Sequence, residues 1–91
     1  MKLYFTTSLN NRMADDLEFA RFILTSLQRY NVKDWGEMCE EDKTLNDWAW
    51  KHQKGRIVAR YNHVKYGEDI YIITTFMADE KQVELMFCHE Y

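Results

Sequence analysis

The sequence predicts a single α+β domain over residues 1–91, in which two N-terminal helices pack on a three-stranded antiparallel β-meander. Three observations carry this prediction. Apolar residues recur every three or four positions before Gly55, as in amphipathic helices, and alternate with polar residues after it, as in strands. The segments after Gly55 are joined by short connections, which favours antiparallel pairing. A chain of 91 residues supplies one hydrophobic core and has little room for a second.

The N-terminal part is expected to hold a long helix. Residues 3–6 before it are rich in β-forming side chains, so a short N-terminal edge strand is a further element that the fold can include. The helix is expected from about Asn11 to Tyr30, where apolar residues recur at helical spacing. This stripe consists of Met13, Leu17, Ala20, Leu24 and Leu27, with Phe19 and Ile23 widening it. Acids near the start of the segment and Arg29 near its end suit the helix dipole.

A second helix is expected to begin near Trp35, because Asp34 and the glutamate three positions later have the spacing of a capping box. A glycine in that first turn weakens it, so a start at Cys39 or Glu40 is the alternative. The expected apolar face of this helix consists of Met38, Leu45, Trp48, Ala49 and His52. Gly55 suits the left-handed conformation that often ends a helix.

Three strands are expected after this helix, over residues 57–61, 69–76 and 83–87. The segment 69–76 consists almost entirely of β-branched and aromatic residues after its first position. Its apolar residues lie on both faces, which favours a central strand. Gly67 and the polar residues 78–81 supply the two turns.

Charge and cysteine content exclude several classes of function. The formal net charge of −3 argues against direct nucleic-acid binding, since proteins that neutralise phosphates usually carry a basic stripe. Cys39 and Cys88 are too few for a disulfide scaffold and lack zinc-site spacing, so we expect two reduced thiols. No apolar run is long enough for a signal peptide or a membrane span. We therefore expect a cytoplasmic protein without membrane contact.

Six acids fall within fourteen residues, with a single lysine among them. They are Asp34, Glu37, Glu40, Glu41, Asp42 and Asp47. One interpretation is a negative patch that binds a basic groove on a partner, as a nucleic-acid mimic would. Asp15, Asp16 and Glu18 would extend this patch if the two helix starts lie close together. The other interpretation is a solvated helix face, because the helix dipole alone favours acids near an N-terminus.

Trp48 and Trp50 lie on roughly perpendicular faces of the second helix, so both cannot point straight into one core. We expect one to be buried and the other to be half exposed beside the acids, where a tryptophan often contributes most to an interface. We place Trp50 with the six acids as the partner-binding set. The alternative is a tryptophan that lies flat over the edge of the sheet.

No catalytic residues, metal ligands or cofactor are predicted. Cys39 lies among carboxylates, which disfavour a thiolate. Cys88 and His89 are neighbours on a strand, so they should point to opposite faces. The acids do not have the spacing of a calcium-binding EF-hand loop. A small hydrolase or metal-dependent enzyme is the competing hypothesis, and it requires a reactive cysteine or a bound metal ion.

Several segments resemble a small, uncharacterised family of bacterial, phage and plasmid accessory proteins. The segments are Thr6-Thr7-Ser8, Asn11-Arg12-Met13-Ala14, residues 34–42 (Asp-Trp-Gly-x-x-Cys-x-Glu-Asp), Asn46-Asp47, residues 55–61, residues 70–74 and Glu90-Tyr91. The central segment 34–42 is the most specific part of the resemblance. This chain departs from the family pattern at residues 75–79 and 86–91, and it contains no proline. The resemblance supplies no catalytic residues.

Together, the resemblance and the acids predict a non-enzymatic inhibitor from a mobile genetic element, of the anti-CRISPR or anti-restriction type. Such a protein would act in the host bacterial cytoplasm, where it would present its acidic patch to the basic nucleic-acid-binding groove of a defence protein complex. The alternative is a self-associating structural module, such as a homodimer that pairs edge strands or its last hairpin.

Overall fold

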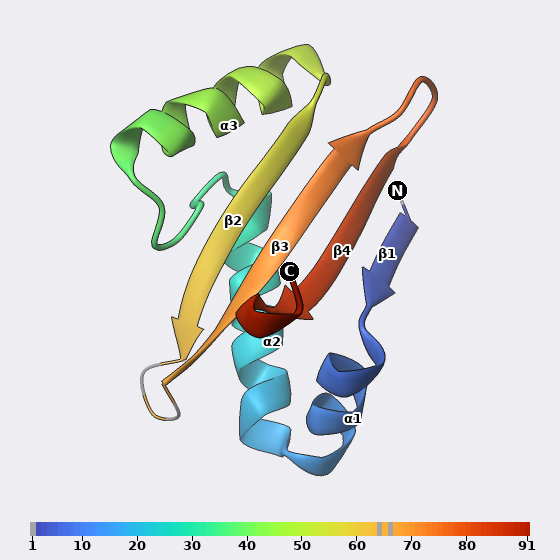
Figure 1. Cartoon of the computed structure of the whole chain (residues 1–91), viewed down its shortest axis with the longest axis vertical. Coiled ribbons are helices and arrows are strands. Elements are labelled where there is room, and N and C mark those ends of the chain that lie inside the picture. Colours follow the sequence, from blue (N-terminus) through green and yellow to red (C-terminus); the bar gives the residue numbers. More distant parts are fainter. Residues whose placement is uncertain (1, 64, 66) are drawn as a thin grey trace.

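The computed structural model describes residues 2–63, 65 and 67–91 and contains a four-stranded sheet with three α-helices (Figure 1). In chain order the elements are β1 (Lys2–Phe5), α1 (Thr7–Asp15), α2 (Leu17–Asn31), α3 (Glu40–His52), β2 (Arg56–His63), β3 (Glu68–Phe76), β4 (Lys81–Phe87) and the 3₁₀ turn η1 (Cys88–Glu90). The strand order across the sheet is β1-β4-β3-β2. The last three strands form the expected antiparallel meander.

The sheet is mixed rather than purely antiparallel, because β1 adds to it as a fourth strand. β1 pairs in parallel with β4, with Leu3 opposite Val83 and Phe5 opposite Leu85. The three strands of the meander extend one to two residues beyond the expected bounds at one or both ends. The α+β class and the edge strand are therefore confirmed, whereas the predicted arrangement of three strands and two helices is wrong in detail. Residues 64 and 66 of the expected connection lie outside the described residues.

The long helix expected over residues 11–30 is two helices that meet at Asp16. This residue has extended backbone angles, with φ −135° and ψ 101°. Its backbone N–H donates to the carbonyl of Arg12, and this hydrogen bond caps the end of α1. Its carboxylate accepts from the backbone N–H of Phe19 at 3.1 Å, and this hydrogen bond caps the start of α2. An aspartate in this position satisfies an amide of the first turn that has no partner within the helix. The break allows α1 to pack near β4 while α2 crosses the sheet.

α2 covers one face of the sheet with residues spaced three and four apart. Phe19, Ile23, Ser26 and Tyr30 are buried on this helix. They face the core side chains of the meander, which are Ile57, Ala59, Tyr61, Ile70, Ile72, Val83, Leu85 and Phe87. The stripe expected from the sequence is confirmed in part. Phe19 and Ile23 are buried, and Met13 and Leu27 pack against the core, whereas Leu17 and Leu24 are 68% and 58% exposed. The buried face of α2 is centred on Phe19, Ile23 and Ser26, one position before Ala20, Leu24 and Leu27.

No α-helix covers the opposite face of the sheet among the described residues. Figure 1 shows α2 behind the sheet, η1 and the C-terminus in front of it, and α3 alongside β2. The ring of Tyr91 contacts the ring of Tyr71 on this front face, with 5.4 Å between centroids. Ile73 and Met86 lie on the same face by strand alternation and are still buried. The C-terminal residues therefore dock on the sheet.

α3 begins at Glu40, as in the alternative start, and not near Trp35. Asp34 and Glu37 do not form the expected capping box, because the Asp34 carboxylate accepts from Gly36 and the Glu37 carboxylate accepts from Asn62. The helix ends at His52, and Gln53 adopts the left-handed conformation of the C-cap (φ 55°), two residues before the expected glycine stop. Within the described part of the chain, none of the helices is both long and apolar enough to cross a membrane.

Candidate binding surface around α3

The segment before α3 runs along the outer edge of β2 and closes it. Gly36 forms an isolated parallel bridge with Arg60. The backbone N–H of Glu37 donates to the Arg60 carbonyl at 2.7 Å, and the Arg60 N–H donates to the carbonyl of Trp35 at 3.2 Å. On either side of Arg60, the outward backbone groups of β2 bond to side chains. The N–H of Asn62 donates to the Glu37 carboxylate at 3.1 Å.

Asn46 extends this cover from within α3. Its side-chain amide donates to the Val58 carbonyl at 2.9 Å and accepts from the Val58 N–H at 3.3 Å. Asn46 is buried, so it replaces a neighbouring strand at this point of the edge. Edge strands with unpaired amides invite pairing with other chains, and this cover removes that possibility along β2. It also determines which face of α3 points toward the sheet.

Three of the six predicted partner-binding acids accept hydrogen bonds from other parts of the fold in this arrangement. The Asp34 carboxylate accepts from the Arg29 guanidinium at 2.7 and 3.2 Å and from the Gly36 N–H. The hydrogen bond from Arg29 lowers the pKa of Asp34 below its ordinary value. Asp47 accepts from the indole N–H of Trp35 at 2.8 Å, and Glu37 caps Asn62 as described above. These acids hold the segment before α3 against the fold.

The other three acids form the first turn of α3, where the helix dipole favours negative charge. The side chain of Glu40 is 92% exposed and lies 3.7 Å from Lys43. Glu41 is exposed, and Asp42 is half-buried. The end of α3 carries Lys51 and His52. The outward surface of α3 is therefore acidic at one end only.

The acids around the start of α2 do not extend this patch. Asp16 pairs with Arg12, and Glu18 pairs with Lys65. Figure 1 shows the junction of α1 and α2 at the opposite end of the molecule from α3. The two helix starts are therefore far apart, and the condition for one continuous acidic surface is not met.

The two tryptophans of α3 have different environments. Trp50, which the sequence placed in the partner-binding set, is half-buried and packs against the core, with ring centroids 5.6 Å from Tyr30 and 5.9 Å from Trp35. The ammonium nitrogen of Lys81 lies 4.2 Å from the centroid of the Trp50 ring. Trp48 is 53% exposed. The exposed aromatic residue of α3 is therefore Trp48.

α3 turns apolar side chains toward solvent. Leu45 is 61% exposed, and together with Trp48 it forms an outward ridge one turn long. The residues that α3 buries are Asn46 and Ala49. The apolar face expected for this helix is therefore wrong for Leu45 and Trp48 and confirmed for Ala49. The hydrogen bonds of Asn46 to the edge of β2 turn this polar side chain inward beside Ala49.

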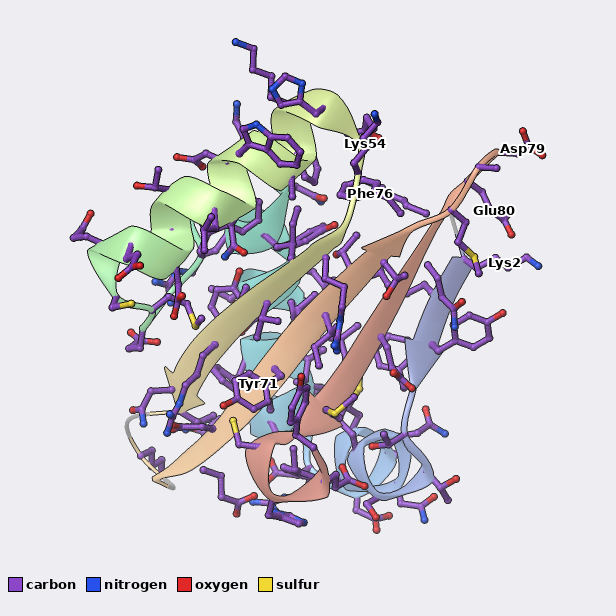
Figure 2. The ribbon with its side chains drawn as sticks, turned by 45° about the horizontal axis from the view of Figure 1, so that its top comes forward. Lys2, Lys54, Tyr71, Phe76, Asp79 and Glu80 are labelled. Carbon is purple, nitrogen blue, oxygen red and sulfur yellow. The ribbon has the colours of Figure 1, made fainter. Side chains whose placement is uncertain are left out.

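A groove of about 340 Å³ separates this ridge from the helix-free face of the sheet. It is lined by Met38, Asp42, Leu45, Asn46, Arg56, Val58, Tyr71 and Tyr91. Figure 2 shows Tyr71 on the strand β3, on the face that η1 shares. Sequence reasoning missed Arg56, Tyr71 and Tyr91 as candidate site residues. Neither Arg56 nor Tyr91 gives a strong signal in the sequence, because only the tertiary fold brings them to α3 and places the Arg56 guanidinium 5.7 Å from the centroid of the Tyr91 ring.

The two cysteines are free thiols that lie on different elements. Cys39 is exposed before α3, and Cys88 is half-buried in η1. Burial raises the pKa of the Cys88 thiol, which favours the neutral form over the reactive thiolate. Among the residues that the structure describes, no three His, Cys, Asp or Glu side chains gather as a metal site would require.

The chain was also compared with known proteins. No protein-family model, no curated protein sequence and no solved structure matches it.

Proposed function

We propose that the protein is a non-enzymatic inhibitor that binds another protein through the outward face of α3 and the groove beside it. The observation that carries this proposal is the orientation of α3. The helix buries polar Asn46 and exposes Leu45 and Trp48. Exposed apolar side chains beside a groove are typical of a contact surface that a partner covers.

The chemistry of this surface suits a protein partner with a basic patch. A tryptophan next to an apolar groove has the character of an interface hot spot, since it buries a large area at a small cost in side-chain entropy. Glu40, Glu41 and Asp42 lie one to two turns away on the same helix and would supply a polar rim. Carboxylates at the rim accelerate association with a positively charged partner and weaken as salt rises.

The proposed targets are the nucleic-acid-binding grooves of bacterial defence complexes, of the CRISPR or restriction type. Such grooves are basic because they hold phosphates. An acidic turn that carries an exposed aromatic side chain imitates both the charge and the stacking surface of a nucleic acid. The resemblance of residues 34–42 to accessory proteins of phages and plasmids supports this choice of target.

The test is inhibition and capture of assembled defence complexes by the tagged protein at moderate salt. We expect one complex to be recovered in stoichiometric amount and its nucleic-acid cleavage to be blocked. The variant Glu40→Lys/Glu41→Lys and the variant Trp48→Ala should each lose both effects while remaining folded.

The matched control is Asp15→Lys/Asp79→Lys, which changes the net charge by the same amount at exposed acids outside α3. This control should still bind and inhibit. Equal binding by the control and by Glu40→Lys/Glu41→Lys would contradict the proposed surface. A wild-type protein that neither binds nor inhibits any of the complexes would contradict the proposed function.

A further inference from the structure

One edge of the sheet is covered by other parts of the chain, and the other edge is open. The outer edge of β2 is covered by residues 35–37 and by Asn46, as described above. The outer edge of β1 has no neighbouring element among the described residues (Figure 1). The sheet can therefore gain a strand only beside β1.

The hydrogen bonds of β1 show which of its backbone groups point outward. The N–H of Thr6 donates to the carbonyl of Leu85 at 3.1 Å, so Thr6 and the even-numbered residues of β1 turn their backbone groups toward β4. Because these groups alternate along a strand, Leu3 and Phe5 turn their N–H and C=O groups away from the sheet. These outward groups form a template for another strand.

The side chains along this edge are also accessible. Leu3 and Tyr4 are 39% and 44% exposed. Phe5 is half-buried and packs against the core. Lys2, a residue type that often discourages edge pairing, is engaged by Glu80 at 3.3 Å. An apolar edge with a neutralised lysine is suited to pairing with a strand of similar character.

We propose that β1 pairs in antiparallel orientation with β1 of a second copy of this chain, around a two-fold axis perpendicular to the sheet. Residues that oppose each other across two paired strands lie on the same face of the sheet. An axis between two residues would place neighbours from opposite faces against each other, so the axis must pass through a residue. With the axis at Tyr4, Leu3 of each copy lies opposite Phe5 of the other. The outward groups of both residues are then used, in about four inter-chain hydrogen bonds.

A second copy fits this edge better than an arbitrary strand does. Leu3 and Phe5 lie on the face that α2 covers, so their pairing continues the apolar core across the interface. The two Tyr4 side chains meet on the other face. Lys2 of each copy lies opposite Thr6 of the other, so no like charges oppose each other directly.

This pairing would leave the surface around α3 free. The two β2 strands would be separated by seven strand spacings, roughly 34 Å, with α3 of each copy farther out. Both helix-free faces would point to the same side. If the proposed function holds, the dimer presents two copies of the α3 surface and gains avidity for a partner with repeated sites. The dimer itself does not depend on that function.

Cysteine cross-linking tests the pairing and its register. In a background of Cys39→Ser and Cys88→Ser, Tyr4→Cys should form a disulfide-linked dimer under mild oxidation. The two positions form a non-hydrogen-bonded pair with Cα atoms about 4.5 Å apart, which a disulfide can span. The control is Lys2→Cys, on the same face of the same strand, whose two copies would be roughly 13 Å apart and should not cross-link. Cross-linking of Leu3→Cys in place of Tyr4→Cys would overturn the register.

Sedimentation equilibrium of the unmodified chain provides a test without cysteines. We expect a reversible dimer whose dissociation constant rises tenfold or more in Tyr4→Lys, because two lysines would then oppose each other at the axis. Leu24→Lys, at an exposed leucine of α2, should leave the dimer unchanged. A wild-type chain that remains monomeric at millimolar concentration would overturn the proposal. If Tyr4→Lys fails to fold, the cross-linking result decides.

Discussion

A Cβ atom on Gly36 would come within 1.9 Å of the carbonyl oxygen of Arg60. The segment before α3 can approach β2 this closely because Gly36 has no side chain, so the two backbones are in direct contact. Gly36 also has a φ of 75°, which favours glycine. The segment before α3 therefore has a structural role: it closes the edge of the sheet and places α3.

Gly36→Ala should destabilise the fold strongly. The left-handed backbone costs about 1–2 kcal/mol for a residue with a side chain, and the contact with the Arg60 carbonyl requires backbone displacement. We expect a total loss of about 3 kcal/mol or more in the free energy of unfolding, measured by urea denaturation. The matched control is Gly55→Ala, since Gly55 has a φ of 81° and open space around it. That variant should lose only about 1 kcal/mol, and an equal loss in both variants would contradict the close approach.

Asn46→Ala should open the edge of β2 at Val58. The substitution leaves the N–H and C=O of Val58 without the partner that Asn46 provides, at a cost of about 2–3 kcal/mol. Hydrogen exchange gives a local measurement, in which the Val58 amide should lose protection relative to the amide of Ala59, which points into the sheet. Asn10→Ala, at an exposed position of α1, is the control and should change stability by less than about 0.5 kcal/mol. Unchanged protection of Val58 would show that Asn46 does not cover the edge.

The strands and the α+β class could be predicted because their signals are local. Alternation over residues 57–61 and 83–87 survives in β2 and β4, and the β-branched run in β3 lies at the centre of the meander. The parallel pairing of β1 with β4 joins segments about 80 residues apart, and no local pattern specifies it. The break at Asp16 was missed because an aspartate is also a common residue on an exposed helix face.

The candidate site was predicted less well, for a physical reason. Amphipathicity assumes that a helix buries its apolar side, but α3 is held by Asn46 at a sheet edge and exposes Leu45 and Trp48. The acids before α3 gave a local charge signal, but the sequence did not show which groups they would pair with. Arg29 engages Asp34, and that pairing emerges only in the fold. The acidic first turn of α3 was predictable because it depends on the helix alone.

The pair of Arg29 and Asp34 should contribute to the acid sensitivity of the fold. The hydrogen bond from Arg29 lowers the pKa of Asp34 in the folded state below its ordinary value of 3.8. A depressed carboxyl pKa stabilises the fold above the unfolded pKa, and this contribution is lost as the pH falls through the folded pKa. The relevant window therefore lies below about pH 4. Because the Asp34 side chain is 46% exposed, solvent screening keeps the contribution to about 1 kcal/mol or less.

Carboxyl NMR titration checks this prediction directly. The Asp34 carboxyl should titrate below its ordinary range in the wild-type protein and should move toward that range in Arg29→Gln. Arg29→Lys is the informative control, because it keeps the charge and loses the two-point contact with the carboxylate. A wild-type Asp34 that titrates in the ordinary range would contradict the pairing.

The two tryptophans of α3 should separate stability from binding. Trp50→Ala removes a half-buried ring that packs against Tyr30 and Trp35 and carries the ammonium of Lys81 over its face. We expect a loss of about 3 kcal/mol in the free energy of unfolding, from the cavity and the lost cation–π contact. Trp48→Ala removes an exposed ring and should change stability by less than about 0.5 kcal/mol. Denaturation followed by circular dichroism measures both variants without relying on the fluorescence of either ring. If Trp48→Ala were the more destabilising substitution, Trp48 would be part of the core and the outward ridge of α3 would not exist. A larger loss of stability in Trp50→Ala, as we expect, leaves Trp48 available to contact a partner.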